Sequence, residues 1–337
     1  MFLRSFTGLI ATCAGLLLVL AGCTKTGPEQ DAQRTSAPAG EPLRICAGTT
    51  YSALPVIAEQ KGLFAREGLN VVLIPYRSGS EAVEDMLAGK CDISTAAETL
   101  VARYGSKRDD LRILAAILKS DSLSLIVTRS QAKIRNISDL KGRRVGVEEG
   151  TAAHYFLDLL LSKNRLSEKD LQLQFKKAPE LIAALRDGTL EAVITNYLEA
   201  FRMEEELGKA VVLIGDPGIA LNRGYLAARE GTVAKRGSDI SRLLSVLHSA
   251  ELFIDENPEE AKKLFAASLK LSPRLAEKSW GSITPRLSLE PAMILALEDN
   301  GRWLREKEGG KSVHKSFREM MMPEFLRQVS PESVTIP

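Results

Sequence analysis

Short runs of β-branched and aliphatic residues alternate with helical patterns along most of the chain. Residues 43–47, 71–76 and 91–95 are strand candidates of this kind. Between the second and third runs, apolar residues at 83, 86 and 87 have helical spacing and Gly89 follows them. Further strand candidates are residues 111–117 and 123–128. Strands that alternate with helices predict βαβ units and a mostly parallel sheet.

The same pattern begins again after residue 130. The strands and helices predicted in this second half are residues 144–147, 152–161, 181–186 and 190–195. When Gly188 is aligned with Gly89, Asn196–Tyr197 falls on Ala97–Glu98. Two similar α/β lobes are therefore expected. Open α/β sheets bind ligands at the carboxyl ends of their strands, so we expect a cleft there.

The rest of the chain adds helices to this pair of lobes. Residues 238–307 have helical patterns broken by prolines, and residues 225–228 are predicted as a strand that returns to the first lobe. We expect one lobe to comprise residues 42–127 and 225–337, and the other residues 128–224. Ligand binding is expected to close the lobes about hinges near residues 127–130 and 224–229, where the chain passes between the repeats.

The first residues have the pattern of an export signal. Arg4 precedes a twelve-residue run, 9–20, in which only Thr12 is polar. A membrane-spanning helix needs about 20 apolar residues, so the run is too short to be a stable anchor. Leu20-Ala21-Gly22-Cys23 resembles the lipobox of bacterial lipoproteins, which implies removal of residues 1–22 and acylation of Cys23. An ordinary secretory signal cut nearby and a buried helix are the alternatives. Residues 23–41 have the composition of a flexible tether.

Composition excludes several classes of function. The 337 residues are 45% hydrophobic and 26% charged, with a formal net charge of +2. Such a chain can bury a core and lacks the basic surface of a nucleic-acid-binding protein. The nucleophile elbow, the HExxH zinc motif, the phosphate-binding loop and the dinucleotide fingerprint are all absent. Three scattered histidines do not form a metal-ligand motif, and we expect neither metal, cofactor nor catalysis.

Cys46 and Cys91 are the two thiols of the predicted body. If their strands are parallel neighbours aligned at their carboxyl ends, Cys46 lies opposite about Ser94. Cys91 would then be displaced by roughly 10 Å at about 3.3 Å per residue. Since a disulfide needs Cα atoms within about 7 Å, the two thiols are expected to stay unbridged.

Small-residue turns precede several predicted helices. They are Thr49-Thr50-Tyr51-Ser52, Ser78-Gly79-Ser80, Ala96-Ala97-Glu98-Thr99 and Gly150-Thr151-Ala152-Ala153-His154. A helix N-terminus exposes unpaired N–H groups and the positive end of the helix dipole, which suits an anionic or polar ligand. Any one of these turns could be a plain helix cap. Four of them in two repeated lobes favour a ligand site.

Residues 54–69, LPVIAEQKGLFAREGL, are similar to the opening of the nitrate, sulfonate and taurine class of solute-binding proteins of ABC importers, a class that also includes binders of thiamine pyrimidine precursors. Residues 78–80, 88–93 and 137–147 resemble the next landmarks of that class. The resemblance implies a periplasmic-binding-protein type II fold, with two α/β lobes joined by two crossing strands around a ligand cleft. It places the binding loops on Thr50, Tyr51, Ser78, Gly79, Ala97, Glu98, Thr151, His154 and Asn196.

One segment departs from the family pattern. Where the family often has an aromatic residue, an acid and a proline, this chain has Asn196-Tyr197-Leu198-Glu199. Helix N-termini favour an anion such as a sulfonate. A carboxylate in the cleft, from Glu98 or Glu199, would instead pair with an amine-bearing ligand. The sequence leaves both ligands open and adds Glu199 to the candidate site.

The functional hypothesis is therefore a monomeric, extracytoplasmic lipoprotein. It would be anchored to a bacterial membrane through Cys23 and deliver a small molecule to an ABC permease and its ATPase. A binder of a thiamine pyrimidine precursor and a module that signals to a membrane sensor are alternatives. An enzyme on the same fold is disfavoured, because the related activities belong inside the cell and this chain has an export signal.

Overall fold

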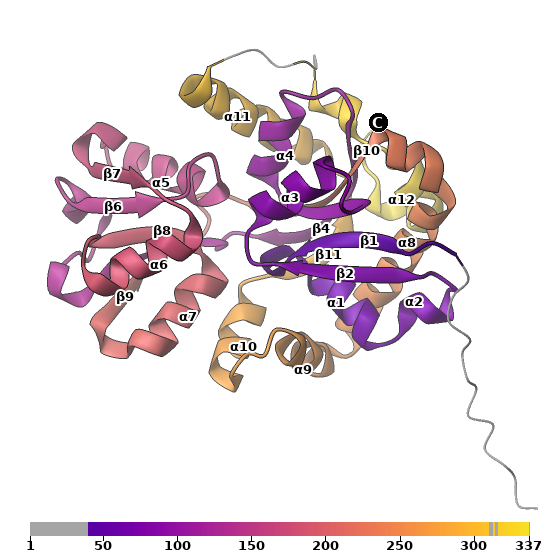
Figure 1. Ribbon diagram of the computed structural model, residues 1–337, viewed down its shortest axis with the longest axis horizontal. Coiled ribbons are helices and arrows are strands. Elements are labelled where there is room, and N and C mark those ends of the chain that lie inside the picture. Colours follow the sequence, from indigo (N-terminus) through magenta and orange to yellow (C-terminus); the bar gives the residue numbers. More distant parts are fainter. Residues whose placement is uncertain (1–39, 310–312, 314–315, 337) are drawn as a thin grey trace, which may run out of the picture. The chain divides into compact units, whose positions relative to one another are not determined.

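The computed structural model describes residues 40–309, 313 and 316–336. The predicted signal, Cys23 and the tether up to residue 39 lie outside these residues. Residues 37–337 form one compact unit. Two sheets organise it, and each carries its own helices (Figure 1). We call the six-stranded sheet with its helices the first lobe, and the five-stranded sheet with its helices the second lobe.

The first sheet has the strand order β11-β4-β10-β3-β1-β2. Its strands are β1 (Leu43–Gly48), β2 (Val71–Tyr76), β3 (Ile93–Ala97), β4 (Leu111–Ser120), β10 (Asn222–Arg229) and β11 (Thr284–Ser288). β1 pairs in parallel with β2 and β3, as the alternation of strands and helices predicts. β10 lies antiparallel between β3 and β4 and is the returning strand expected near residues 225–228. β11, in a segment predicted as helical, was not anticipated.

The second sheet repeats this plan in the order β7-β6-β8-β5-β9. Its strands are β5 (Ser124–Arg129), β6 (Arg144–Val147), β7 (Gln172–Phe175), β8 (Ala192–Asn196) and β9 (Val211–Ile214). β6 pairs in parallel with β7 and β8, whereas β5 is antiparallel to β8 and β9. β5 therefore occupies the place in this sheet that β10 occupies in the first.

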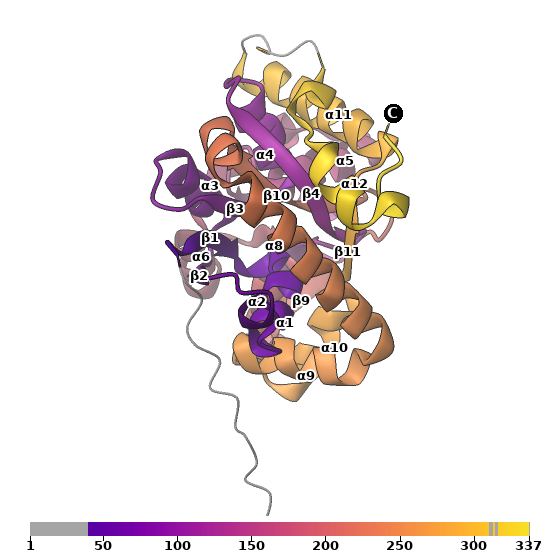
Figure 2. The ribbon, with the colours of Figure 1, turned by 90° about the vertical axis from the view of Figure 1, so that its right-hand side faces the viewer.

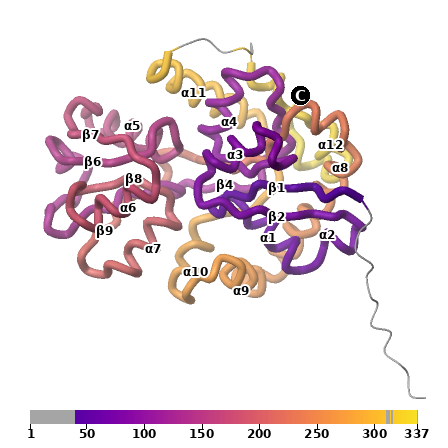
Figure 3. Tube along the Cα trace, viewed as in Figure 1, coloured from indigo at the N-terminus to yellow at the C-terminus, as the bar shows by residue number. Residues whose placement is uncertain are grey.

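The chain crosses between the sheets twice, and Figure 3 traces both passages. It leaves β4 at Ser120 and enters β5 at Ser124, and it returns from β9 at Ile214 to β10 at Asn222. Both crossings come a few residues before the lobe boundaries expected from the sequence. β5 is the first element after the first crossing, and β10 is the first element after the second. Each of these antiparallel strands therefore enters its sheet directly from the other sheet.

Helices follow the strands in both lobes. In the first half they are α1 (Ala53–Gln60), α2 (Leu63–Arg66), α3 (Gly79–Leu87) and α4 (Glu98–Gly105), and in the second α5 (Ala152–Lys163), α6 (Ala178–Asp187) and α7 (Tyr197–Leu207). The aligned glycines 89 and 188 both adopt the left-handed conformation, with φ of 82° and 89°. The strands after them end at Ala97 and Asn196, and α4 and α7 begin at the next residue, as the repeat predicts.

The C-terminal helices pack on the first lobe, as predicted. They are α8 (Glu230–Glu256), α9 (Pro258–Ser268), α10 (Pro273–Gly281), α11 (Pro291–Glu308) and α12 (Pro323–Val329). α10 also contacts α7 of the second lobe. Leu243, Leu244 and Leu247 of α8 are fully buried in the same core as Leu43 and Ile45 of β1. α8 contacts β4 and β10 (Figure 2). No helix in the described part of the chain combines the length and apolarity needed to cross a membrane.

The expected absence of a disulfide is wrong. Cys46 and Cys91 are bridged, with Cα atoms 5.9 Å apart. The register was predicted correctly, since Cys46 pairs with Ser94. The error lies in treating Cys91 as part of an extended strand. β3 begins only at Ile93, and the chain bends at Asp92, whose N–H donates to the Arg44 carbonyl (2.9 Å). This bend returns Cys91 to β1.

Candidate ligand-binding cleft

One cavity of about 80 Å³ is lined by residues from both lobes. β3 and β8 end at it, and β5 begins there, because β5 runs antiparallel to β8. Its polar and small lining residues are Thr50, Tyr51, Ser78, Gly79, Ser80, Ala97, Ser124, Thr151, Ala152, Ala153, Ala178, Thr195 and Asn196. The volume suits a small molecule, since one water needs at least about 10–15 Å³ of such space.

Five helices of the two lobes begin at this cavity. The N-cap residues of α3, α4, α5 and α7 are Ser78, Ala97, Thr151 and Asn196, and α6 begins at the lining residue Ala178. A side-chain cap occupies one N–H in α3, α5 and α7, whereas Ala97 provides none for α4. Each helix start has more N–H groups than one cap can satisfy. Small lining residues allow a ligand to approach these donors.

The turn before α1 is held by buried hydrogen bonds. The Gly48 N–H donates to Thr95 Oγ1 (2.8 Å), and the Ser52 hydroxyl donates to the Gly48 carbonyl (2.6 Å). Tyr51 lines the cavity beside β10, where a Cβ added to Gly224 would lie 2.6 Å from the Tyr51 ring. Burial, together with the charge of Glu98, raises the pKa of Tyr51 well above its usual range. Tyr51 therefore remains a protonated hydrogen-bond donor.

Seven of the ten candidate residues surround this cavity: Thr50, Tyr51, Ser78, Gly79, Ala97, Thr151 and Asn196. The candidate set did not include the lining residues Arg77, Ser124, Glu148 and Thr195, although the sequence placed Glu148 at or near the cleft mouth with Arg77 as a nearby cation. Thr195 precedes the candidate Asn196, and Arg77 precedes the candidate Ser78. Both would have been found if each candidate turn had been extended by one residue. Ser124 could not have been found in this way, because nothing local shows that β5 begins at the cleft. Glu98, His154 and Glu199 are not among the lining residues.

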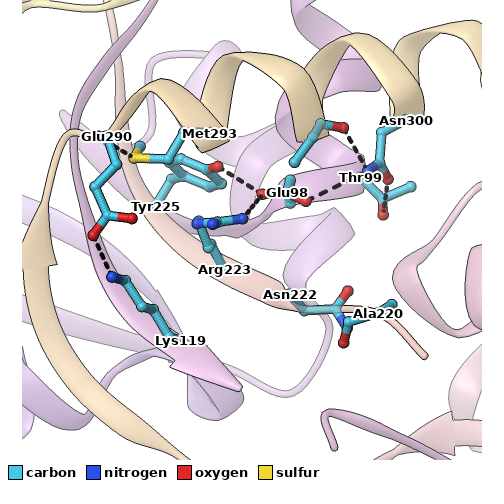
Figure 4. Close-up of polar contacts among 11 residues, drawn as sticks. Glu98, Thr99, Lys119, Ala220, Asn222, Arg223, Tyr225, Glu290, Met293 and Asn300 are labelled. Atoms are coloured by element: carbon cyan, nitrogen blue, oxygen red, sulfur yellow. Dashed lines mark hydrogen bonds and ion pairs between the residues drawn. The ribbon is translucent and has the colours of Figure 1, made fainter. Parts of the chain in front are cut away.

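Glu98 belongs to a buried network beside the cavity wall (Figure 4). Tyr225 donates to Glu98 Oε2 at 2.7 Å, and Arg223 approaches the same oxygen at 3.4 Å. Asn300 of α11 donates to Oε1 at 3.4 Å. Burial raises the pKa of Glu98 to about 7, against the opposing effects of Tyr225 and Arg223. With its oxygens engaged inside the protein, Glu98 is not placed to meet a ligand.

Glu199 lies beside the cleft in an ion-pair cluster. Arg77 of the first lobe contacts Glu199 Oε2 at 2.8 Å, and Arg202 contacts Oε1 at 2.8 Å. Arg77 is 71% exposed, so this bridge between the lobes is largely solvated. The remaining charged lining residue is Glu148, which lies 3.2 Å from Lys177 and 3.5 Å from the Ser80 hydroxyl.

His154 is buried behind the start of α5. The Gly150 N–H donates to His154 Nδ1 (3.1 Å), so Nδ1 accepts. Neutral His154 therefore carries its proton on Nε2, which donates to Glu168 (2.6 Å). This hydrogen bond, together with the contact from Lys307, lowers the pKa of Glu168 to about 2 against the opposing effect of burial. The side chain thus supports the cleft from behind.

His154, Asp158 and Glu168 are a group of potential metal ligands, with one ligand atom of each within 4.8 Å of the others. The Lys307 ammonium, however, lies 2.7 Å from Asp158 and 2.8 Å from Glu168. The proton on His154 Nε2 also turns that nitrogen into a donor. The protein's own cation occupies this cluster, and it does not fit a metal ion as it stands.

The comparisons agree with this architecture. The family model described as NMT1/THI5 like matches residues 49–261, more than half of the chain. The chain belongs to the NMT1/THI5-like family. A Bacillus subtilis (strain 168) relative, named for binding aliphatic sulfonates, is 24% identical over 278 residues, 80% of each chain. A Haemophilus influenzae relative, named for thiamine biosynthesis, is 24% identical over 247 residues, 71% of this chain and 77% of that one.

Solved structures show the fold of this NMT1/THI5-like chain. The alkanesulfonate-binding protein of Xanthomonas axonopodis pv. citri, solved with MOPS, matches with a TM-score of 0.69 and 19% identity, over 80% of this chain and 95% of that one. A desulfurization enzyme matches with a TM-score of 0.62 and 16% identity, over 87% and 99%. The predicted two-lobed periplasmic-binding-protein fold is confirmed, and the same fold also carries an enzyme.

Proposed function

We propose that this protein is an extracytoplasmic solute-binding lipoprotein that captures a small anion, of the sulfonate, nitrate or taurine kind, and delivers it to an ABC importer. The observation that carries the proposal is the convergence of five helix N-termini on one small cavity. Each N-terminus carries roughly half a positive charge and several N–H donors. The donors come from both lobes, so an anion between them would draw the lobes together.

The carboxylates near the cleft support an anion over a ligand that relies on an amine. Glu98 is engaged by Tyr225, Arg223 and Asn300, and Glu199 by Arg77 and Arg202. Glu148 does line the cavity, but Lys177 lies beside it. An amine would have to displace one of these internal partners, whereas an anion uses donors that small side chains leave accessible.

The lining also supports binding over covalent chemistry. Among the described residues that line the cavity there is neither a histidine nor a cysteine. Nucleophilic catalysis needs an activated nucleophile with an adjacent base. The carboxylate nearest a lining hydroxyl is Glu148, 3.5 Å from Ser80, and Lys177 is ion-paired with it at 3.2 Å. The export signal predicted from the sequence and the resemblance of Cys23 to a lipidation site support a location outside the cytoplasm. A relative named for sulfonate binding supports the ligand class.

A charge placed in the cleft tests the proposal. Ala153 lines the cavity in the first turn of α5, where an acidic side chain suits the helix dipole. Ala153→Asp is compared with Ala153→Asn, which has nearly the same size and no charge. Two like charges about 6 Å apart at an effective dielectric constant of about 20 repel by about 3 kcal/mol, roughly a 100-fold loss of affinity.

Isothermal titration calorimetry with taurine, ethanesulfonate, nitrate and an aminopyrimidine provides the measurement. We expect an anion to bind the wild type and the aspartate variant to lose much more affinity than the asparagine variant. Equal losses in the two variants would remove the anion from this cavity. Binding of the aminopyrimidine alone would replace the proposed ligand class.

A further inference from the structure

Helix α11 belongs to the first lobe and ends against the second. Leu297 and Leu304 are buried in the first lobe's core, and the helix contacts α4. On another face, Trp303 Nε1 donates to Asp158 of α5 at 2.7 Å. The Trp303 ring also lies edge-to-face with His154 and Tyr155, with ring centres 5.0 Å and 5.2 Å away. α11 therefore contacts α5 through hydrogen bonding and ring packing.

Lys307 adds an ionic contact one turn later on α11. Its ammonium group bridges Asp158 at 2.7 Å and Glu168 at 2.8 Å, and both carboxylates belong to the second lobe. Lys307 and these two partners are each less than 30% exposed. Residues four apart lie on the same helix face, so Trp303 and Lys307 meet α5 together. Such shielded, charge-assisted contacts are stronger than exposed ion pairs.

His154 connects this contact with the cleft. Its Nε2 donates to Glu168, the partner of Lys307, and its Nδ1 accepts from the Gly150 N–H. The next residue, Thr151, is the N-cap of α5 and lines the cavity. A chain of direct contacts thus runs from α11 through Glu168 and His154 to the turn from which α5 presents its N–H donors.

We propose that Trp303 and Lys307 form a clamp that holds the two lobes closed, and that His154 is a positioning residue that transmits the clamp to the helix start at the cleft. The inference rests on the proposed function, because the cleft is taken as the ligand site. Rotation of the lobes apart would separate α11 from α5 and break these contacts. The clamp therefore favours the closed state before a ligand arrives, and apparent affinity rises with the fraction of closed protein.

The first experiment measures closure without ligand. In the double variant Trp303→Phe, Lys307→Met the ring and the aliphatic stem remain, while the indole donor and the ammonium are lost. Arg302→Met is the matched control, since Arg302 is 63% exposed and pairs with Asp299 on the same helix. Small-angle scattering of the ligand-free protein should give a larger radius of gyration for the double variant than for the wild type and the control.

Asp158→Asn provides the same test from the second lobe, in case the double variant folds poorly. Identical ligand-free scattering for wild type, control, double variant and Asp158→Asn would overturn the clamp. With ethanesulfonate as the probe, the double variant should lose at least about tenfold in affinity, the lower end of the range for one lost hydrogen bond to a charged group, while the control changes less than twofold.

Two substitutions separate the contacts of His154. Asparagine can place its oxygen where Nδ1 accepts from Gly150, whereas glutamine can place its amide where Nε2 donates to Glu168. If His154 positions the turn, His154→Gln should weaken ethanesulfonate binding and speed hydrogen exchange at residues 150–153 more than His154→Asn does. If His154 has only a structural role, His154→Gln should lower the thermal unfolding temperature more than His154→Asn. The two variants should then show the same hydrogen exchange at residues 150–153.

The scattering test is made without ligand, so its outcome does not depend on which ligand the protein binds. If no anion binds, the proposed function fails while ligand-free scattering still decides the clamp. If anions bind and scattering does not respond to any of these variants, the clamp fails and the proposed function stands.

Discussion

Replacement of Glu98 by glutamine tests whether burial or ion pairing controls this carboxylate. Glu98 is 3% exposed, and Arg223 lies 3.4 Å from it. At an effective dielectric constant of about 20, an ion pair at this distance gains about 5 kcal/mol. Removal of both charges from water costs several kcal/mol each. The pKa of Glu98 is raised to about 7, so burial outweighs the attraction and the folded protein favours the neutral acid.

The raised pKa of Glu98 determines how the free energy of unfolding changes with pH. Because the pKa of Glu98 rises on folding from 4.5 to about 7, its stabilising contribution is complete below pH 4.5 and is lost as the pH rises to about 7. At 1.36 kcal/mol for each pH unit, the loss is about 3 kcal/mol. The amide introduced by Glu98→Gln resembles the neutral acid and does not titrate. We expect this variant to match the wild type near pH 4.5 and to exceed it by up to about 3 kcal/mol at pH 8.

Urea unfolding followed by circular dichroism at both pH values gives the free energies of unfolding. Glu67→Gln, at an exposed position, controls for the loss of one carboxylate. A Glu98→Gln variant that is several kcal/mol less stable than the wild type at pH 8 would refute the reasoning. It would show that the buried charge of Arg223 needs an ionised Glu98 as its partner. Ligand affinity should change less than threefold, since Glu98 does not line the cavity.

Two other predictions concern the first lobe. The Cys46–Cys91 bridge closes a loop of 45 residues, so replacing both cysteines by alanine should lower the free energy of unfolding by about 4 kcal/mol in the chain-entropy model, measured by denaturant unfolding; a change below about 1 kcal/mol would contradict it. Gly224→Ala would place a Cβ 2.6 Å from the Tyr51 ring, and we expect a loss of about 1–3 kcal/mol in stability together with weaker anion binding, measured by thermal unfolding and calorimetry; wild-type values for both would show that the ring can move freely.

The local pattern was sufficient to predict many strands and helix starts. Residues 71–76 and 144–147 are strands with the predicted bounds. Short apolar runs flanked by turn residues usually form strands. The aligned Gly89 and Gly188 also predicted where α4 and α7 begin. Such features depend on residues close together in the sequence, and there the prediction was reliable.

Side-chain direction and long-range pairing could not be predicted in the same way. Thr151 and Ala153 face the cavity, but a helix turns about 100° per residue, and His154 packs behind them. Glu98 follows Ala97 directly yet bonds inward to Tyr225. The contact between Trp303 and Asp158 joins residues 145 positions apart, and no local pattern marks it.

The position of β10 constrains the order in which the lobes can be completed during synthesis. β10 is central in the first sheet, between β3 and β4, yet it follows all five strands of the second sheet in the chain. The ribosome synthesises the chain from its amino end. Every strand of the second lobe is therefore synthesised before β10, which joins β3 and β4 in the first sheet. Both cysteines of the Cys46–Cys91 bridge are therefore synthesised early, whereas the central strand of the same sheet is synthesised late. In topological terms, the second lobe is inserted between two neighbouring strands of the first, since Ser120 and Asn222 on either side of it are paired.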